Sequence, residues 1–287
     1  MNNISLGRYS PYDTFLHRLD PRTKILSMIF LMVIIFFSFG SVWTNLIIYL
    51  LIGIMNFILM SIAKIKLSQL FNQLKMMWMM MLFLLIINIF TMKEEIPIII
   101  PNVGEFVSFT IPGIELTIYY SAFINSFYII FRLALMISLT LILTSTTKPM
   151  DLTYGLEWFM APLKFLSFPV HEVAMTISLA LRFIPTLLDE TDRIMKAHSS
   201  RGVDFQEGSF VEKVSAIVSL IVPLFVSSFQ RSEELANAME TRGYDPSKPR
   251  TRYRLLKWKL SDTLSLIFIL VIFGVTLTLS IIGFKII

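Results

Sequence analysis

Two short stretches in the second half of the chain share a pattern that could bind carboxylates. The first reads MKAHSSRGVDF over residues 195–205 and the second ANAMETRGYDP over residues 236–246. Aligned on Arg-Gly they lie 41 residues apart and share the pattern S/T-R-G-x-D. The matched pairs are Ser200 and Thr241, Arg201 and Arg242, Gly202 and Gly243, and Asp204 and Asp245. Because a guanidinium group binds a carboxylate through two parallel hydrogen bonds, the two arginines suit docking onto acidic groups of a partner.

A purely structural role would explain one such stretch. Glycine just past a helix adopts the left-handed conformation that closes the helix, and arginine in the last turn complements the negative end of the helix dipole. A single Ser-Arg-Gly is therefore most simply a helix C-terminus. Two copies at the ends of similarly patterned helices favour a docking role, with two equivalent receptors.

Residues for catalysis or cofactor binding are missing from the sequence. There is no cysteine, and the three histidines, His17, His171 and His198, are far apart. Neither HExxH, nor a phosphate-binding G-x-x-x-x-G-K-[ST] loop, nor G-x-G-x-x-G occurs. The sequence therefore predicts no catalytic residue, no metal site and no cofactor, and it predicts that this chain does not hydrolyse ATP by itself.

The elements that must position the two Arg-Gly stretches are long helices. Residues 171–201 and 209–242 both begin apolar and end polar, and a shorter helix is expected over 151–168. The sequence predicts a bend near Pro185, and Pro223 lies inside the last helix. The apolar part of that helix, over 209–229, could span a membrane by hydropathy, but it is short and broken by proline. We expect it to lie near the membrane surface or to pack under a helix bundle.

The rest of the chain is typical of a membrane protein. Hydrophobic residues make up 55% and charged residues only 16%, against about 25% charged in soluble domains. A span needs about 20 mostly apolar residues. The predicted spans are 25–39, 42–63, 76–92, one within 115–147, and 262–284. The loop between the third and fourth has two pieces that resemble short strands. We expect an all-α polytopic membrane protein with about five transmembrane helices and a cytoplasmic domain of long amphipathic coupling helices.

The distribution of basic residues predicts the orientation. With the N-terminus in the cytoplasm, 22 of the 25 Lys and Arg lie inside, which follows the positive-inside rule. The expected domains are then a four-span transmembrane domain over 1–147, a cytoplasmic coupling domain over 148–260, and a last transmembrane helix over 261–287. The basic string before the last span is expected to hold anionic lipid headgroups and not nucleic acid.

The sequence resembles the transmembrane T component (EcfT) of energy-coupling factor transporters, the vitamin and metal importers of the ABC class in prokaryotes. The resemblance rests on HRLDPRTK at residues 17–24, on the two Arg-Gly motifs, and on the order of spans and long helices. Ser200 and Thr241 stand where the family most often has alanine.

The resemblance implies a function in the prokaryotic cell membrane. Two ABC ATPase subunits would each receive one Arg-Gly helix end at the cytoplasmic face and would supply all of the ATP chemistry. The chain would also hold a small membrane protein, the S component, that captures the substrate. It would then be a non-catalytic coupling subunit for uptake of vitamins or other micronutrients, and the S component would determine which one.

Two other classes of function are less consistent with the residues. A secondary transporter would need polar residues within its spans and an inverted repeat, but the spans carry little beyond Arg132. A membrane-embedded enzyme would need converging His, Asp or Glu near one interface, and no such group is evident. Arg132 could serve equally in bundle packing or in function.

Overall fold

The computed structural model describes residues 10, 12–37, 42–91, 98–100, 104–106, 108–111, 116–166, 168–203, 209–245, 248 and 257–282. The chain divides into two compact units. Unit 1 contains Met1–Lys148 and Lys257–Ile287, and unit 2 contains Pro149–Leu256. Each unit has its own helices, so they are described in turn.

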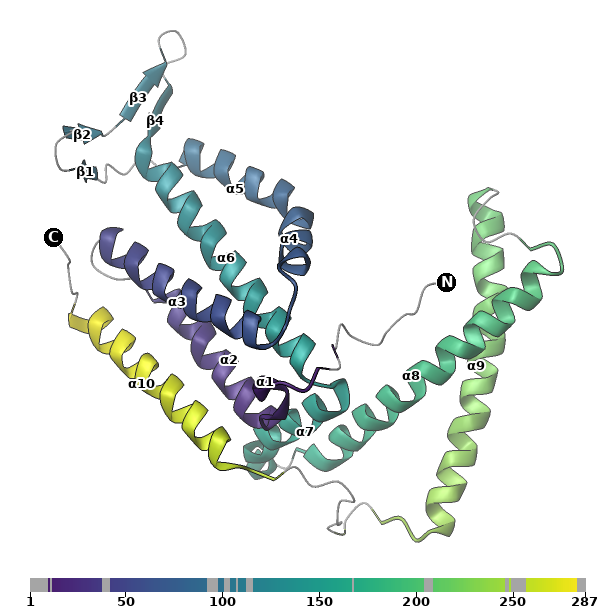
Figure 1. The fold of residues 1–287 in the computed structure, drawn as a ribbon. Helices are drawn as coiled ribbons and strands as arrows, with labels where there is room; N and C mark the ends of the chain where they lie inside the picture. The colour runs from purple at the N-terminus through teal and green to yellow at the C-terminus, as the bar shows by residue number, and fades with distance from the viewer. Residues whose placement is uncertain are drawn as a thin grey trace. The chain divides into compact units, whose positions relative to one another are not determined.

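Unit 1 is a bundle of helices with two small hairpins (Figure 1). Its helices are α1 (Phe15–Arg18), α2 (Pro21–Phe36), α3 (Val42–Ile62), α4 (Leu67–Met76), α5 (Trp78–Thr91), α6 (Tyr120–Thr146) and α10 (Leu260–Ile282). Between α5 and α6, β1 (Ile98–Ile100) pairs antiparallel with β2 (Gly104–Phe106), and β3 (Ser108–Ile111) with β4 (Leu116–Tyr119). The predicted strands are therefore present, and the other regular elements in the described part of unit 1 are helices.

The centre of unit 1 is α2, which packs against α6 and α10. Ile34 and Ile35 of α2 are fully buried, and they form a core cluster with the buried Tyr49 of α3 and Leu139 of α6. The outward surfaces are apolar as well: Phe57 of α3 is 54% exposed. A surface of this kind would be unfavourable in water and is suited to lipid.

Among the described residues, five helices are long and apolar enough to cross a membrane, and the bent pair α4 and α5 would add a sixth span if it is counted as one. These helices match the five predicted spans only in part. Thr44–Ile62, Ala122–Thr146 and Leu260–Ile282 match predicted spans, and Val170–Ser199 and Phe210–Thr241 also meet the length and hydropathy criteria. The predicted first span corresponds to α2, which has only 16 residues, and the third to α5, with 14. The all-α polytopic fold class is confirmed.

The predicted span over 76–92 is interrupted at its start. Met77 leaves the helical conformation (φ −97°, ψ 1°), and the axes of α4 and α5 differ in direction by 55°. The sequences explain the break, because α4 is polar on one face (LSQLFNQLKM) while α5 is apolar throughout. The helix α4 was not predicted, because it lies between the predicted spans 42–63 and 76–92.

The charged residue within α6, Arg132, is hydrogen-bonded inside the bundle. Arg132 donates through Nε to the Tyr49 hydroxyl at 2.7 Å, and its guanidinium carbon lies 5.1 Å from the centre of the Tyr49 ring. Tyr49 Oη in turn donates to the Phe37 carbonyl at 3.0 Å. Arg132 therefore joins α6 to α3, as expected for a packing role.

Unit 2 contains α7 (Pro149–Met160), a short 3₁₀ helix η1 (Ala161–Leu166), α8 (Val170–Ser199) and α9 (Phe210–Thr241). The prediction of one helix over 151–168 is thus divided between α7 and η1. The two long helices are confirmed, with ends within two residues of the predicted positions. Pro185 and Pro223 lie inside α8 and α9 without ending them.

Candidate partner-docking site

The C-terminal end of α8 is closed by a Schellman motif at the first Arg-Gly pair. Gly202 has φ +85°, the left-handed conformation that glycine adopts without strain. Its N–H donates to the Ser199 carbonyl at 3.0 Å, and the Val203 N–H donates to the His198 carbonyl at 3.1 Å. These two bonds define the motif and fix the direction in which Arg201 leaves the helix.

The end of α9 repeats this geometry. Gly243 has φ +68°, its N–H donates to the Glu240 carbonyl at 2.9 Å, and the Tyr244 N–H donates to the Met239 carbonyl at 3.0 Å. Every donor and acceptor lies 41 residues beyond its counterpart in α8. The sequence repeat is therefore also a repeat of hydrogen bonding.

The residue before each arginine turns its hydroxyl back onto the helix. Ser200 Oγ donates to the Lys196 carbonyl at 2.9 Å, and Thr241 Oγ1 donates to the Asn237 carbonyl at 3.0 Å. Both use the carbonyl four residues earlier. Serine and threonine therefore satisfy their own polar groups here and can occupy a position otherwise suited to alanine.

The two arginines are exposed. Within the described part of the chain neither Arg201 nor Arg242 forms an ion pair. Asp245 is paired with Lys248, whose Nζ lies 3.1 Å from Oδ2. Asp204, the other predicted acidic residue, lies outside the described residues. The motifs therefore present two cations on capped helix ends.

The two helices cross and are linked at the crossing. Glu190 of α8 accepts a hydrogen bond from Ser227 Oγ at 2.7 Å through Oε1, and one from Arg231 of α9 at 2.9 Å through Oε2. Figure 1 shows the C-terminal ends of α8 and α9 well apart within unit 2. Eleven residues separate the crossing from each motif arginine, a distance of about 16 Å along the helix.

The HRLDPRTK segment forms a second polar centre, in unit 1. Asp20 caps α2 by accepting from the Arg22 N–H at 2.9 Å, and its own N–H donates to Asp262 Oδ1 at 2.8 Å. Asp262 is 1% exposed, and its other oxygen accepts from the Lys259 N–H at 2.8 Å. Buried Lys24 donates to the Thr146 carbonyl at 2.9 Å. The segment thereby ties α2 to the ends of α6 and α10 that are nearest in sequence to unit 2.

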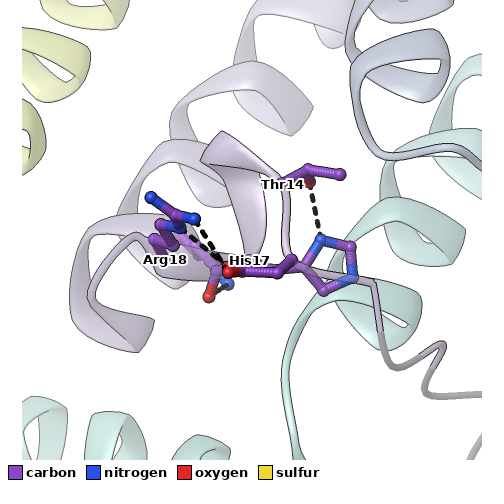
Figure 2. A network of polar contacts seen from close by, with 5 residues as sticks. Thr14, His17 and Arg18 are labelled. Carbon is purple, nitrogen blue, oxygen red and sulfur yellow. Dashed lines mark hydrogen bonds and ion pairs between the residues drawn. The ribbon is translucent and has the colours of Figure 1, made fainter.

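The short helix α1 carries polar contacts of its own (Figure 2). The Thr14 hydroxyl lies 2.7 Å from His17 Nδ1, and His17 Nε2 lies 3.0 Å from the Ser10 carbonyl. A carbonyl can only accept, so Nε2 carries the proton and Nδ1 accepts from Thr14. Burial lowers the pKa of His17, as does the nearby Lys24 charge, against the opposing effect of the Ser10 carbonyl. The hydrogen bond from Arg18 lowers the pKa of Asp13.

Comparison with known proteins identifies the family. The sequence profile of the cobalt transport protein family, CbiQ, matches residues 13–253. The chain is 42% identical to the energy-coupling factor transporter transmembrane protein EcfT of Bacillus subtilis (strain 168), over 95% of this chain and 96% of the relative. The EcfT proteins of Staphylococcus aureus (strain 04-02981) and Lactococcus lactis subsp. cremoris (strain MG1363) are 41% and 39% identical, each over 94% of this chain, and over 94% and 96% of their own lengths.

The chain belongs to the EcfT family. It is therefore a multi-pass transmembrane component of an energy-coupling factor transporter and not an enzyme. Membership in this family is evidence against the two alternative functions, a secondary transporter and a membrane-embedded enzyme. The matched region contains both HRLDPRTK and the two Arg-Gly ends. No cluster of potential metal ligands occurs among the described residues.

Several residues that link the helices of this EcfT chain were not recognised from the sequence. Glu190 and Arg231 were not singled out, because each is one of many charged residues on a polar helix half. A signal was available: the two positions are also 41 residues apart and have opposite charge. Asp262 was taken only as the start of the last span, and no local pattern reveals a bond to Asp20.

Proposed function

We propose that this chain is the coupling subunit of an ATP-driven importer in which Arg201 and Arg242 each dock onto one ATPase subunit. The ATPases bind and hydrolyse ATP, and this chain needs no cofactor of its own. α8 and α9 transmit the movement of the ATPases to the membrane. A small membrane S component binds the substrate, which is a vitamin or another micronutrient.

The observation that carries this proposal is the pair of equivalent capped ends at separate tips of α8 and α9. Both have the same Schellman hydrogen bonds, and both expose an arginine that has no ion pair among the described residues. A forked guanidinium on a rigid helix end favours a fixed carboxylate of a partner. With each arginine about 16 Å from the helix crossing, one receptor for each is the natural arrangement.

The proposal also requires that the Arg-Gly ends face the cytoplasm. The support is the distribution of Lys and Arg, with 22 of 25 on one side, which also places the N-terminus inside. The apolar face of α9, which includes the exposed residues Val218, Val222 and Phe225, would lie at the membrane surface or against the S component. Because the chain has no cysteine, introduced cysteines report this topology directly. A cysteine at position 200 should react with an impermeant reagent only in inverted vesicles.

Purification in a mild detergent tests the assembly. The tagged chain should co-elute with two ATPase subunits and one small membrane protein. The complex should hydrolyse ATP, while the chain stripped of ATPases should not. Recovery of a chain that transports substrate without any ATPase would contradict the proposal.

A further inference from the structure

Unit 1 contains a cavity that neither the coupling function nor the helix packing accounts for. Its volume is about 440 Å³, and it lies among α1, α2, α3, α6 and α10. Its lining comes from the first turns of α2 and α10 and the last turns of α3 and α6, so it lies at one end of the bundle. Lining positions on α10 run from Ser261 to Ile269, a rise of about 12 Å.

The lining of this cavity is apolar and continues into a lipid-facing surface. Leu59, Leu139 and Ile142 contribute to the walls, while Leu264 and Phe268 at its edge are each 60% exposed. The Lys24 ammonium also borders the cavity, but it is bonded to the Thr146 carbonyl and lies near the Thr147 hydroxyl and the His17 carbonyl. An elongated apolar space that opens toward lipid suits a hydrocarbon chain.

Basic and aromatic residues directly precede α10, whose second residue, Ser261, lines this cavity. Lys257, Trp258 and Lys259 directly precede the start of α10, and both lysines are exposed. Trp258 is 46% exposed and donates through Nε1 to Thr263 Oγ1 at 2.7 Å. A tryptophan flanked by lysines at a helix start is typical of the membrane interface, where such lysines attract anionic headgroups.

The acidic groups of this region are either paired or buried. Asp13 accepts two hydrogen bonds from Arg18, while Asp20 and Asp262 are buried and accept from backbone N–H groups. The charge that Lys257 and Lys259 present at the surface is therefore positive. It complements a phosphate that lies above a chain inserted in the cavity.

We propose that this cavity is a binding site for one anionic glycerophospholipid, with an acyl chain among α2, α3, α6 and α10 and the headgroup at Lys257 and Lys259. The inference rests on the membrane location of the family and does not depend on ATPase docking. A bound lipid would fill the space beside Lys24 and Thr146, the last residue of α6.

A cavity-filling substitution tests the acyl part of the site. The full-length chain, purified with its partners, is exchanged into detergent with phosphatidylglycerol and washed, and the retained lipid is measured by native mass spectrometry. Wild type should retain one phosphatidylglycerol per chain. Ser265→Phe, which fills the cavity, should lose it, whereas Val271→Phe on the exposed surface of the same helix should keep it. Equal retention in all three proteins would refute the site, as would equal loss in both variants.

The headgroup part is tested without altering the cavity. Lys257→Gln and Lys259→Gln should each weaken retention of phosphatidylglycerol about fivefold relative to phosphatidylcholine, while Lys75→Gln should not. No change in that preference would overturn the headgroup assignment.

The molecule that occupies the cavity can be identified by crosslinking. Because the sequence has no cysteine, a single introduced cysteine carries the crosslinker at a known position. A benzophenone attached to Ser261→Cys at the cavity should form an adduct with phosphatidylglycerol in vesicles of known composition. An adduct with a partner protein, or with another part of this chain, would show a different occupant and overturn the proposal.

Discussion

Arg231 donates a hydrogen bond to Glu190 at 2.9 Å, and these two residues occupy equivalent positions in the two copies of the helix repeat. Each lies eleven residues before a motif arginine, so the repeat places the crossing of α8 and α9 at the same distance from both ends. The pair therefore sets the separation of Arg201 and Arg242. Its strength can be measured.

Removing this pair should loosen the crossing. The side chains of Arg231 and Glu190 are 32% and 23% exposed, so we expect a coupling energy of about 1 kcal/mol and not the larger value of a buried pair. The measurement is a double-mutant cycle of Glu190→Ala and Arg231→Ala, followed by reversible unfolding in detergent. The more exposed pair Asp245–Lys248, at 37% and 77%, is the control and should give nearly zero. Equal coupling in the two cycles would contradict the assignment.

The left-handed glycines give a second prediction. Gly202→Ala and Gly243→Ala should each destabilise unit 2 by about 1 kcal/mol, because φ is +85° and +68° and an added Cβ meets no atom within 4 Å. The effect is thus backbone strain and not a clash. Asparagine tolerates this conformation and should lose less. Gly274→Ala within α10, where φ is not positive, should be neutral or slightly stabilising. Thermal unfolding of the three alanine variants and of Gly202→Asn and Gly243→Asn tests this order of stability.

Lys24 gives a third prediction, in unit 1. Lys24→Met keeps the length of the side chain but removes the buried bond to the Thr146 carbonyl, so we expect a loss of roughly 1.5–3 kcal/mol. Lys75→Met, at an exposed position on α4, should have little effect. Unfolding in detergent measures both. A loss of stability no larger than in the Lys75 control would show that the hydrogen bond from Lys24 to the Thr146 carbonyl does not stabilise unit 1.

The predictions that came from sequence succeeded where the cause is local. The ends of α8 and α9 follow from Ser, Arg and Gly within a few positions, and the structure has the expected left-handed glycines. The tie between Asp20 and Asp262 joins residues 242 apart, and no local pattern contains that information. The break at Met77 was missed because the apolar methionines on both sides hide the change from an amphipathic to an apolar helix.

His17 makes the packing of α1 sensitive to pH. Burial lowers its pKa in the folded chain below the ordinary value of 6.5, so the unfolded segment binds a proton more readily. The contribution of neutral His17 is therefore complete above pH 6.5 and decreases as the pH falls from 6.5 toward the lowered pKa. Hydrogen exchange of residues 12–24, corrected for intrinsic rates, should accelerate between pH 7.5 and 5.5. His17→Gln, which does not titrate, should show no such change; an identical acceleration in this variant would exclude His17 as the cause.

The last prediction separates docking by Arg201 and Arg242 from simple helix capping. If each guanidinium is buried against a carboxylate of an ATPase, Arg→Ala leaves that carboxylate unpaired. The loss should be roughly 2–5 kcal/mol, or about 30- to several-thousand-fold in affinity. Lysine should restore only part of it, because an ammonium group cannot form the bidentate contact. Capping alone would change helix stability by about 0.3–1 kcal/mol, with lysine nearly equal to arginine.

ATPase pull-down and substrate uptake in the Ala and Lys series at both positions distinguish these cases, with membrane insertion measured in parallel. Arg193→Ala, an exposed arginine eight residues before Arg201, is the matched control and should assemble normally. The double variant Arg201→Ala/Arg242→Ala should insert into the membrane but neither bind ATPases nor transport. Because the two ends are equivalent in geometry and lie on separate tips, each single variant should weaken assembly by itself. Normal assembly and uptake by the double variant would disprove docking and leave the motifs as helix caps.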